Sequence, residues 1–254
     1  MCMEQHNNFY YELSSERTLL CSNVHYLESG YEFDYDHGPT CSGSKTILKI
    51  TFSNIPTLPP SAFIHCPRIT NLYLENVHIE KIIPGAFNSV NSLNELYLSG
   101  NQLTQISDGV FNSLIKLKVL DLSRNNIQNL SVHSFTGTKN LNVLNLSSNA
   151  LRTFDNNFFA HMTKIRDLDL SFNNLDKFNF TQIIDRVENL NLSNNRISNF
   201  DGCFTKLTRL DLSKNELNSL ENFSCPHPSS DMVKLDLSYN FFIRPRNEGI
   251  FNIA

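Results

Sequence analysis

Hydrophobic and polar residues alternate in short runs that recur along most of the chain. The cleanest copy, Leu93 to Leu103, reads Leu-x-x-Leu-x-Leu-x-x-Asn-x-Leu, and further copies begin at 47, 69, 117, 141, 165, 187, 207 and 232. Each Leu-x-Leu predicts a short strand with one buried face. One coil cannot bury that face alone, whereas stacked coils share a continuous core. The pattern therefore predicts nine stacked coils over residues 47–254.

The asparagine of the unit predicts a structural ladder. Its members are Asn101, Asn125, Asn149, Asn173, Asn195, Asn215 and Asn240, while Val77 takes this position in the second unit. An amide turned inward can bond backbone groups of adjacent coils that would otherwise lack partners. Since a buried amide is costly unless fully bonded, we expect Asn149→Ala or Asn149→Leu to destabilise the fold by roughly 1–3 kcal/mol. The ladder also explains part of the chain's surplus of 34 asparagines.

A phenylalanine lies 18 residues into each of four units, at Phe87, Phe111, Phe135 and Phe159. We expect these rings to fill the side of each coil opposite the strand. On the strand side, the positions between the leucines face solvent in rows of neighbours about 5 Å apart. One row is predicted to read Thr51, Tyr73, Tyr97, Asp121, Asn145, Asp169, Asn191, Asp211 and Asp236.

The strand face is the predicted protein-binding surface. Aromatic residues ringed by polar ones are typical of contact hot spots. The candidates are Tyr73, Tyr97, Val119, Asp121, Arg124, Val143, Asn145 and Asp169. For the later, acidic and amide part of the row, the alternative is that Asp and Asn are simply required by the repeat.

Residues 1–46 contain no repeat and are predicted to form a disulfide-stabilised cap, whereas the C-terminal cap is absent or incomplete. The apolar stretch 240–243 predicts either further coils or association with a partner through this edge. The cysteines are Cys2, Cys21, Cys41, Cys66, Cys203 and Cys225. None forms a zinc-type CxxC pair, so disulfides in an oxidising compartment are favoured over reduced structural cysteines. One possible pair is Cys21 with Cys41, although the sequence does not determine connectivity.

The amino terminus carries no signal-peptide pattern. Possible glycosylation sites are Asn129, Asn145, Asn179, Asn191 and Asn222, although some of these are also fragments of the repeat.

With 21 basic and 25 acidic residues, the chain lacks the positive excess that nucleic acid binding requires. No apolar run is long enough to span a membrane. No catalytic or nucleotide motif is complete, because Ser44 interrupts the Gly-Lys of an apparent P-loop over 38–46. The eight histidines lack metal-ligand spacing, and we expect no enzyme activity, cofactor or metal.

The repeat resembles the leucine-rich repeat family in its extracellular 24-residue subtype. That resemblance implies an α/β-class leucine-rich repeat solenoid, a curved horseshoe with a parallel sheet inside and an irregular or 3-10 outer side. Segments 20–25, 47–54, 58–60 and 79–82, with Phe87, are similar to the amino-terminal layout of mosquito immune members. The resemblance implies a secreted protein-binding module whose partner is a complement-like thioester protein or another leucine-rich repeat protein. Toll-like and neuronal adhesion ectodomains share the framework and remain the alternative.

Overall fold

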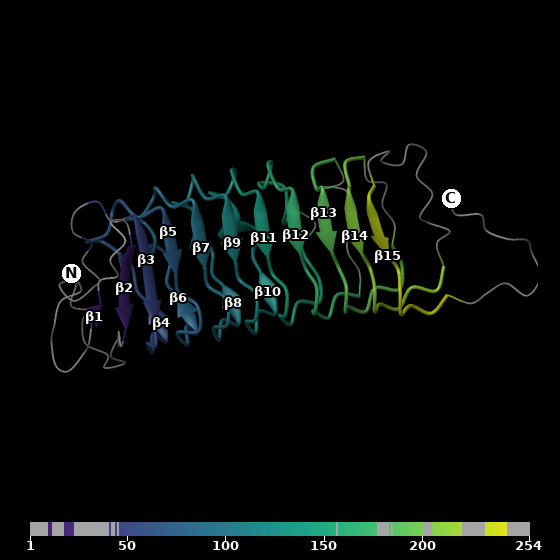
Figure 1. The fold of residues 1–254 in the computed structure, drawn as a ribbon, viewed down its shortest axis with the longest axis horizontal. Coiled ribbons are helices and arrows are strands. Elements are labelled where there is room, and N and C mark those ends of the chain that lie inside the picture. Colours follow the sequence, from purple (N-terminus) through teal and green to yellow (C-terminus); the bar gives the residue numbers. More distant parts are fainter. Residues whose placement is uncertain are drawn as a thin grey trace, which may run out of the picture.

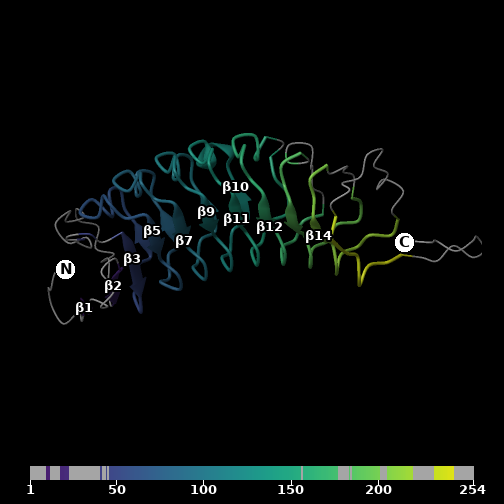
Figure 2. The ribbon, with the colours of Figure 1, turned by 45° about the horizontal axis from the view of Figure 1, so that its top comes forward.

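The computed structural model describes residues 10–11, 18–22, 41, 44, 46–155, 157–176, 183, 185–200, 205–219 and 232–242. They form a curved solenoid whose main sheet has eleven strands in the order β1-β2-β3-β5-β7-β9-β11-β12-β13-β14-β15 (Figures 1 and 2). The strands are β1 Tyr10–Tyr11, β2 Thr18–Ser22, β3 Ile47–Thr51, β5 Asn71–Tyr73, β7 Glu95–Tyr97, β9 Val119–Asp121, β11 Val143–Asn145, β12 Asp167–Asp169, β13 Asn189–Asn191, β14 Arg209–Asp211 and β15 Lys234–Asp236.

The leucines build the core because the three-residue strands from β5 to β14 bury their central residue, whereas Leu235 of β15, the last described strand, is 42% exposed. Leu72, Leu96, Leu120 and Leu144 are fully buried, and each is the parallel partner of the next. Two small parallel sheets lie on the opposite side, β4 (Thr57–Leu58) with β6 (Lys81–Ile82) and β8 (Gln105–Ile106) with β10 (Asn129–Leu130). A 3-10 helix at Val132–Phe135 follows, and no α-helix occurs among the described residues. The predicted solenoid is confirmed.

The first coil has a different register from the one predicted. Lys49, not Thr51, is the parallel partner of Tyr73, and Leu48 pairs with Leu72. A strand repeats every two residues, so a slip of two positions leaves the inward and outward pattern unchanged. β3 alternates over all five of its residues, which is why the pattern alone could not fix the register.

Phenylalanine rings run along the convex side as an aromatic stack. Phe63, Phe87 and Phe111 lie with ring centroids 6.0 Å apart, and Phe135 follows at 5.3 Å from Phe111. Phe159 is buried but does not continue this stack. Phe158 contacts Phe135 at 5.0 Å, and Phe159 packs edge-on against Phe158. With the first coil in its corrected register, Phe63 takes the same position as Phe87 and Phe111.

Each ladder asparagine joins two coils through one amide. Asn125 Nδ2 donates to Leu98 O and Leu122 O at 3.0 Å each and to Ser123 O at 3.1 Å. Its Oδ1 accepts from Leu103 N at 3.1 Å. Equivalent bonds are made by Asn101, Asn149, Asn173, Asn195, Asn215 and Asn240. The bonding pairs the carbonyl and amide groups that the turn after each strand leaves without partners.

The residue before the ladder position adopts a left-handed backbone in every coil. This row is Phe52, Asn76, Gly100, Arg124, Ser148, Phe172, Asn194, Lys214 and Tyr239, with φ between 47° and 69°. Only one member is glycine, although such φ values favour it. At Gly100 a Cβ atom would lie 2.1 Å from Asn76 Oδ1, so a larger residue there would require the exposed Asn76 side chain to turn away. We call these nine positions the left-handed rim.

The amino-terminal segment extends the sheet beyond the repeats. β2 pairs with β3 in parallel, and β1 pairs with β2 in the antiparallel sense. The predicted Cys21–Cys41 pair is wrong, because Cys41 is bonded to Cys66. Their Cα atoms are 4.7 Å apart, and Cys21, also disulfide-bonded, is buried inside β2. The disulfide pairs Cys41, which precedes the first coil, with a cysteine of the next turn. The geometry of the two chain segments, not their spacing in sequence, decides this pairing.

Candidate protein-binding face

The concave face carries two rows of outward side chains that the strand pairing defines. One row is Lys49, Tyr73, Tyr97, Asp121, Asn145, Asp169, Asn191, Asp211 and Asp236. The second is Ile47, Asn71, Glu95, Val119, Val143, Asp167, Asn189, Arg209 and Lys234. The predicted candidates on strands therefore share one face, with Tyr73 beside Tyr97 and Val119 beside Val143.

The early coils hold a compact cluster that we call the tyrosine patch: Lys49, Asn71, Tyr73, Glu95 and Tyr97. The Tyr73 and Tyr97 rings stack with centroids 4.6 Å apart and planes 6° from parallel. Lys49 Nζ lies 4.5 Å from the centroid of the Tyr73 ring, a cation–π contact. Glu95 Oε2 accepts from Asn71 Nδ2 at 2.5 Å and from the Tyr97 hydroxyl at 3.2 Å. All five side chains are half-buried, so the patch is ordered by its own contacts while remaining accessible.

The environment of the patch raises the pKa of both phenols. Partial burial, followed by the charge of Glu95, raises the pKa of Tyr97 to about 12. The same two causes raise the pKa of Tyr73. Like any tyrosine hydroxyl at neutral pH, both are protonated and can donate as well as accept hydrogen bonds. A rigid aromatic pair with polar tips and a cation above one ring is well suited to contact another protein surface.

In the later coils the same position supports the local turn. Asp169, Asp211 and Asp236 each accept at Oδ1 from the backbone N–H and from the hydroxyl of the serine two residues on. These hydroxyl bonds are 2.7 Å long, and the bonds to Ser238 lower the pKa of Asp236. Asn145 and Asn191 also accept from the backbone N–H two residues on.

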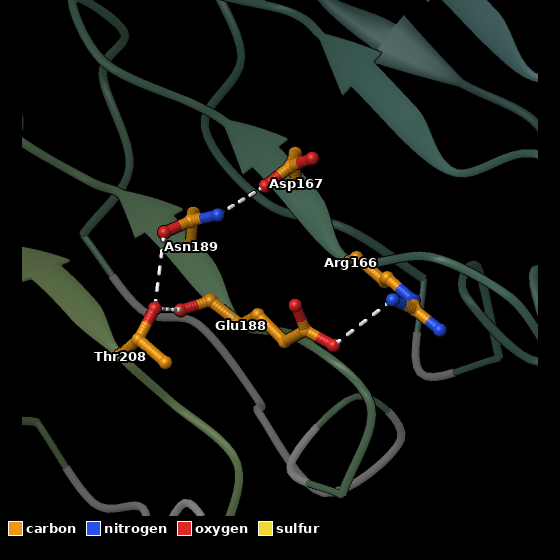
Figure 3. Close-up of polar contacts among 5 residues, drawn as sticks. All are labelled: Arg166, Asp167, Glu188, Asn189 and Thr208. Carbon is orange, nitrogen blue, oxygen red and sulfur yellow. Dashed lines mark hydrogen bonds and ion pairs between the residues drawn. The ribbon is translucent and has the colours of Figure 1, made fainter. Parts of the chain in front are cut away.

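The second row of the later coils is also bonded along the sheet. Asn189 Nδ2 donates to Asp167, and Thr208 Oγ1 donates to Asn189 Oδ1 at 3.2 Å (Figure 3). The acidic and amide row thus fits the alternative interpretation, in which the repeat itself requires these residues. The binding role proposed from the sequence for Asp121 and Asp169 must be weighed against these structural bonds.

The other sequence-predicted residues divide between the concave face, the rim and the undescribed segments. Arg124 is exposed on the left-handed rim, not on a strand. Asn129 is exposed on β10, whereas Asn145 and Asn191 are half-buried on the concave face. Asn179, Asn222, Cys2, Cys203 and Cys225 lie outside the described residues. Lys49 and Glu95 were missing from the predicted site, and the corrected register of the first coil would have brought Lys49 into it.

Among the residues that the structure describes, no three His, Cys, Asp or Glu side chains are grouped so as to hold a metal ion. No helix in that part of the chain has the length and apolar character needed for a membrane span.

Comparison with known proteins assigns the repeat to a family. The protein-family model "Leucine rich repeat" matches residues 46–103, 67–127, 92–138 and 115–175 of this chain. Together these matches span just over half of the chain. The chain belongs to the leucine-rich repeat family. No curated protein matches this leucine-rich repeat chain in sequence.

Solved leucine-rich repeat structures share its fold. The mosquito APL1 leucine-rich repeat domain has a TM-score of 0.70 at 24% identity, covering 87% of this chain and 63% of that one. For the mosquito LRIM1/APL1C complex the TM-score is 0.71 at 23% identity, covering 91% of this chain and 46% of that one. For the Drosophila Toll–Spätzle complex the TM-score is 0.70 at 20% identity, covering 89% of this chain and 35% of that one. This chain spans less than two thirds of each of those chains, and at these identities the likeness shows the fold alone.

Proposed function

We propose that this chain is an extracellular protein-binding module of innate-immune recognition or scaffolding, and that the tyrosine patch contacts the partner. The observation that carries the proposal is the stacked Tyr73–Tyr97 pair, held by Lys49 and Glu95 on an accessible concave face. Tyrosine supplies a large contact area with few rotatable bonds, so little conformational entropy is lost on binding. The partner classes that we expect are a complement-like thioester protein and another leucine-rich repeat protein.

Two observations support the extracellular setting. Cys41 and Cys66 form a disulfide, which is typical of oxidising compartments. Solved structures with this fold include immune proteins captured in protein complexes, LRIM1/APL1C and Toll–Spätzle. A receptor or adhesion ectodomain is the second candidate, since the Toll–Spätzle complex is equally similar in fold. A hydrophobic segment of about 20 residues in the full gene product would favour it, and a downstream coiled coil would favour the first candidate.

The patch is tested by comparative capture from insect body fluid. Wild type, Tyr97→Glu and the control Gln128→Glu are immobilised, and bound proteins are quantified by mass spectrometry. Gln128 is exposed and away from the concave strands, so both variants add one negative charge. We expect at least one protein to bind wild type and control alike, and to bind Tyr97→Glu at least about 30-fold more weakly, a typical hot-spot loss. Capture of the same proteins by all three would remove the patch from consideration.

The compartment is tested separately by counting thiols on denatured, unreduced protein purified from its natural source. Oxidised cysteines should react only after reduction. Six free thiols would rule out the extracellular assignment.

A further inference from the structure

Basic side chains gather at a second place, along the edge where the concave strands begin. They line an open groove of about 840 Å³, together with asparagines and two carboxylates. The cations are Lys116, Lys118, Lys164, Arg166, Arg186 and Lys206. With Asp185 and Glu188 the groove carries a net charge of +4, in a chain whose overall charge is −4. The positive charge is therefore local to this edge and does not reflect the overall composition of the chain. We call this site the basic groove.

The regular spacing of the coils aligns these charges. Four of the cations lie three residues before a strand: Lys116 before β9, Lys164 before β12, Arg186 before β13 and Lys206 before β14. Lys118 lies directly before β9. Adjacent strands are about 4.8 Å apart, so the row from Lys116 to Lys206 crosses four intervals and extends over roughly 19 Å. An extended peptide of about six residues has this length.

The carboxylates of the groove are already paired. Arg166 forms an ion pair with Glu188, drawn as a dashed line in Figure 3, at 3.4 Å, and Arg186 lies 3.6 Å from Asp185. None of the four lysines has a carboxylate within ion-pairing distance in the part of the chain that the structure describes. All four lysines are exposed, and Lys164 Nζ donates to Asn140 Oδ1 at 2.7 Å. Among the described residues, four ammonium groups thus lie along one edge without a carboxylate partner.

We propose that the basic groove binds an acidic, extended polypeptide segment of a partner protein. Charge complementarity provides the attraction. Asn94 and Asn142 add amides that can both donate to and accept from a peptide backbone, whereas the Asn140 amide is bonded to Lys164 and Ile115. Ile115, the neighbour of Lys116 in sequence, is 57% exposed and accepts through its backbone oxygen from Asn140 Nδ2 at 2.7 Å.

Other polyanions fit this site less well. A sulfated polysaccharide carries negative charge along its whole length, whereas a peptide can place a neutral residue beside the two arginine–carboxylate pairs, where the local charge is cancelled. Of the described residues that line the groove, none is aromatic, so the stacking platforms that hold single-stranded nucleic acid are missing from them.

The test is fluorescence anisotropy with a labelled ten-residue peptide containing six Glu or Asp residues and one leucine. In 50 mM NaCl we expect wild type to bind it, and Lys164→Glu/Lys206→Glu to bind at least about tenfold more weakly. Lys81→Glu/Arg152→Glu makes the same charge change at exposed positions elsewhere and should bind like wild type. Raising NaCl to 300 mM should weaken binding, because the screening length falls. Tyr97→Glu should leave peptide binding unchanged, since the tyrosine patch is a separate surface.

Three outcomes would overturn the proposal. One is the absence of peptide binding to wild type at 50 mM NaCl. A second is an equal loss in the Lys81/Arg152 control, which would indicate non-specific attraction. The third is binding of heparin or single-stranded RNA, run in parallel, in preference to the peptide, which would assign the groove to another class of polyanion. Thermal unfolding of each variant verifies that the fold is intact.

Discussion

At the position where β7 carries Tyr97, β14 carries Asp211, and the two residues make different kinds of contact. Asp211 accepts two hydrogen bonds from Ser213 within its own turn. Tyr97 instead stacks on Tyr73 of the preceding coil. The serine after Tyr97 also bonds across coils, because Ser99 Oγ donates to Glu75 Oε1 at 3.0 Å. One repeat position is thus used for the turn in late coils and for a surface cluster in early coils.

This difference distinguishes residues that the fold requires from residues that are available to a ligand. A side chain that caps its own turn has its hydrogen-bonding capacity partly occupied before a partner arrives. The early coils have no such cap at Tyr73 and Tyr97, and they contain the Cys41–Cys66 disulfide and Val77 at the ladder position. We therefore expect the two regions to respond differently to substitution.

The largest expected effect concerns the disulfide of the early coils. Cys41→Ala/Cys66→Ala removes a cross-link between residues 25 apart in sequence, which should lower the free energy of unfolding by about 3 kcal/mol. Denaturant unfolding of the variant and the wild type measures it. A reductant should destabilise wild type by breaking this disulfide, which the double variant no longer contains. An unchanged midpoint would show that the early coils do not depend on the cross-link.

The ladder of the later coils comes next. Asn173→Leu leaves Leu146 O, Leu170 O and Leu151 N without their side-chain partner, so we expect a loss of roughly 2–3 kcal/mol by the same measurement. Asn173→Asp keeps the acceptor for Leu151 N but places a buried carboxylate oxygen against the carbonyl oxygens of Leu146 and Leu170, so a loss at least as large is expected. If leucine were tolerated at this position, the ladder would not be needed for stability.

A smaller effect tests the turn cap itself. Asp211→Ala removes both bonds to Ser213 and should cost about 1 kcal/mol, whereas Asp211→Asn keeps the acceptor and should change stability by less than about 0.5 kcal/mol. Tyr97→Phe serves as the early-coil counterpart, since it keeps the stack and loses one hydroxyl bond to Glu95. Equal stability of Asp211→Ala and wild type would contradict a structural role for the late row.

The smallest effect is in the titration of the tyrosine patch. The pKa of Tyr97 in the folded protein is about 12, above the ordinary tyrosine value of 10.0. The unfolded chain releases this proton first, so its contribution to stability is complete below pH 10 and is lost as pH rises towards 12. A difference titration of tyrosinate absorbance between wild type and Tyr97→Phe should reveal one phenol ionising near pH 12. A difference centred near pH 10 would mean that Glu95 and burial do not act on Tyr97.

The strands and the ladder follow from the sequence, because their period sets both burial and backbone bonding. The repeat period determines which residues are buried, as at the leucines 72, 96 and 120 and the asparagines 101 and 125. Details that depend on lateral contacts between coils did not follow. The choice of Phe158 over Phe159 rests on ring packing, and the Cys41–Cys66 pair rests on the path of the chain before the first coil. Glu95 became part of the site only through bonds to residues on β5 and β7.

The left-handed rim makes the surface chemistry of one edge independent of the interior. Eight of its nine residues carry side chains at a φ that costs of order 1 kcal/mol each, and Phe52, Phe172 and Tyr239 are mostly exposed. Because the backbone takes the same conformation with an aromatic, amide or cationic residue, the identity of the side chain is not set by the coil. The rim therefore offers attachment points at intervals of about 4.8 Å, suited to spectroscopic labels that would report how the solenoid bends.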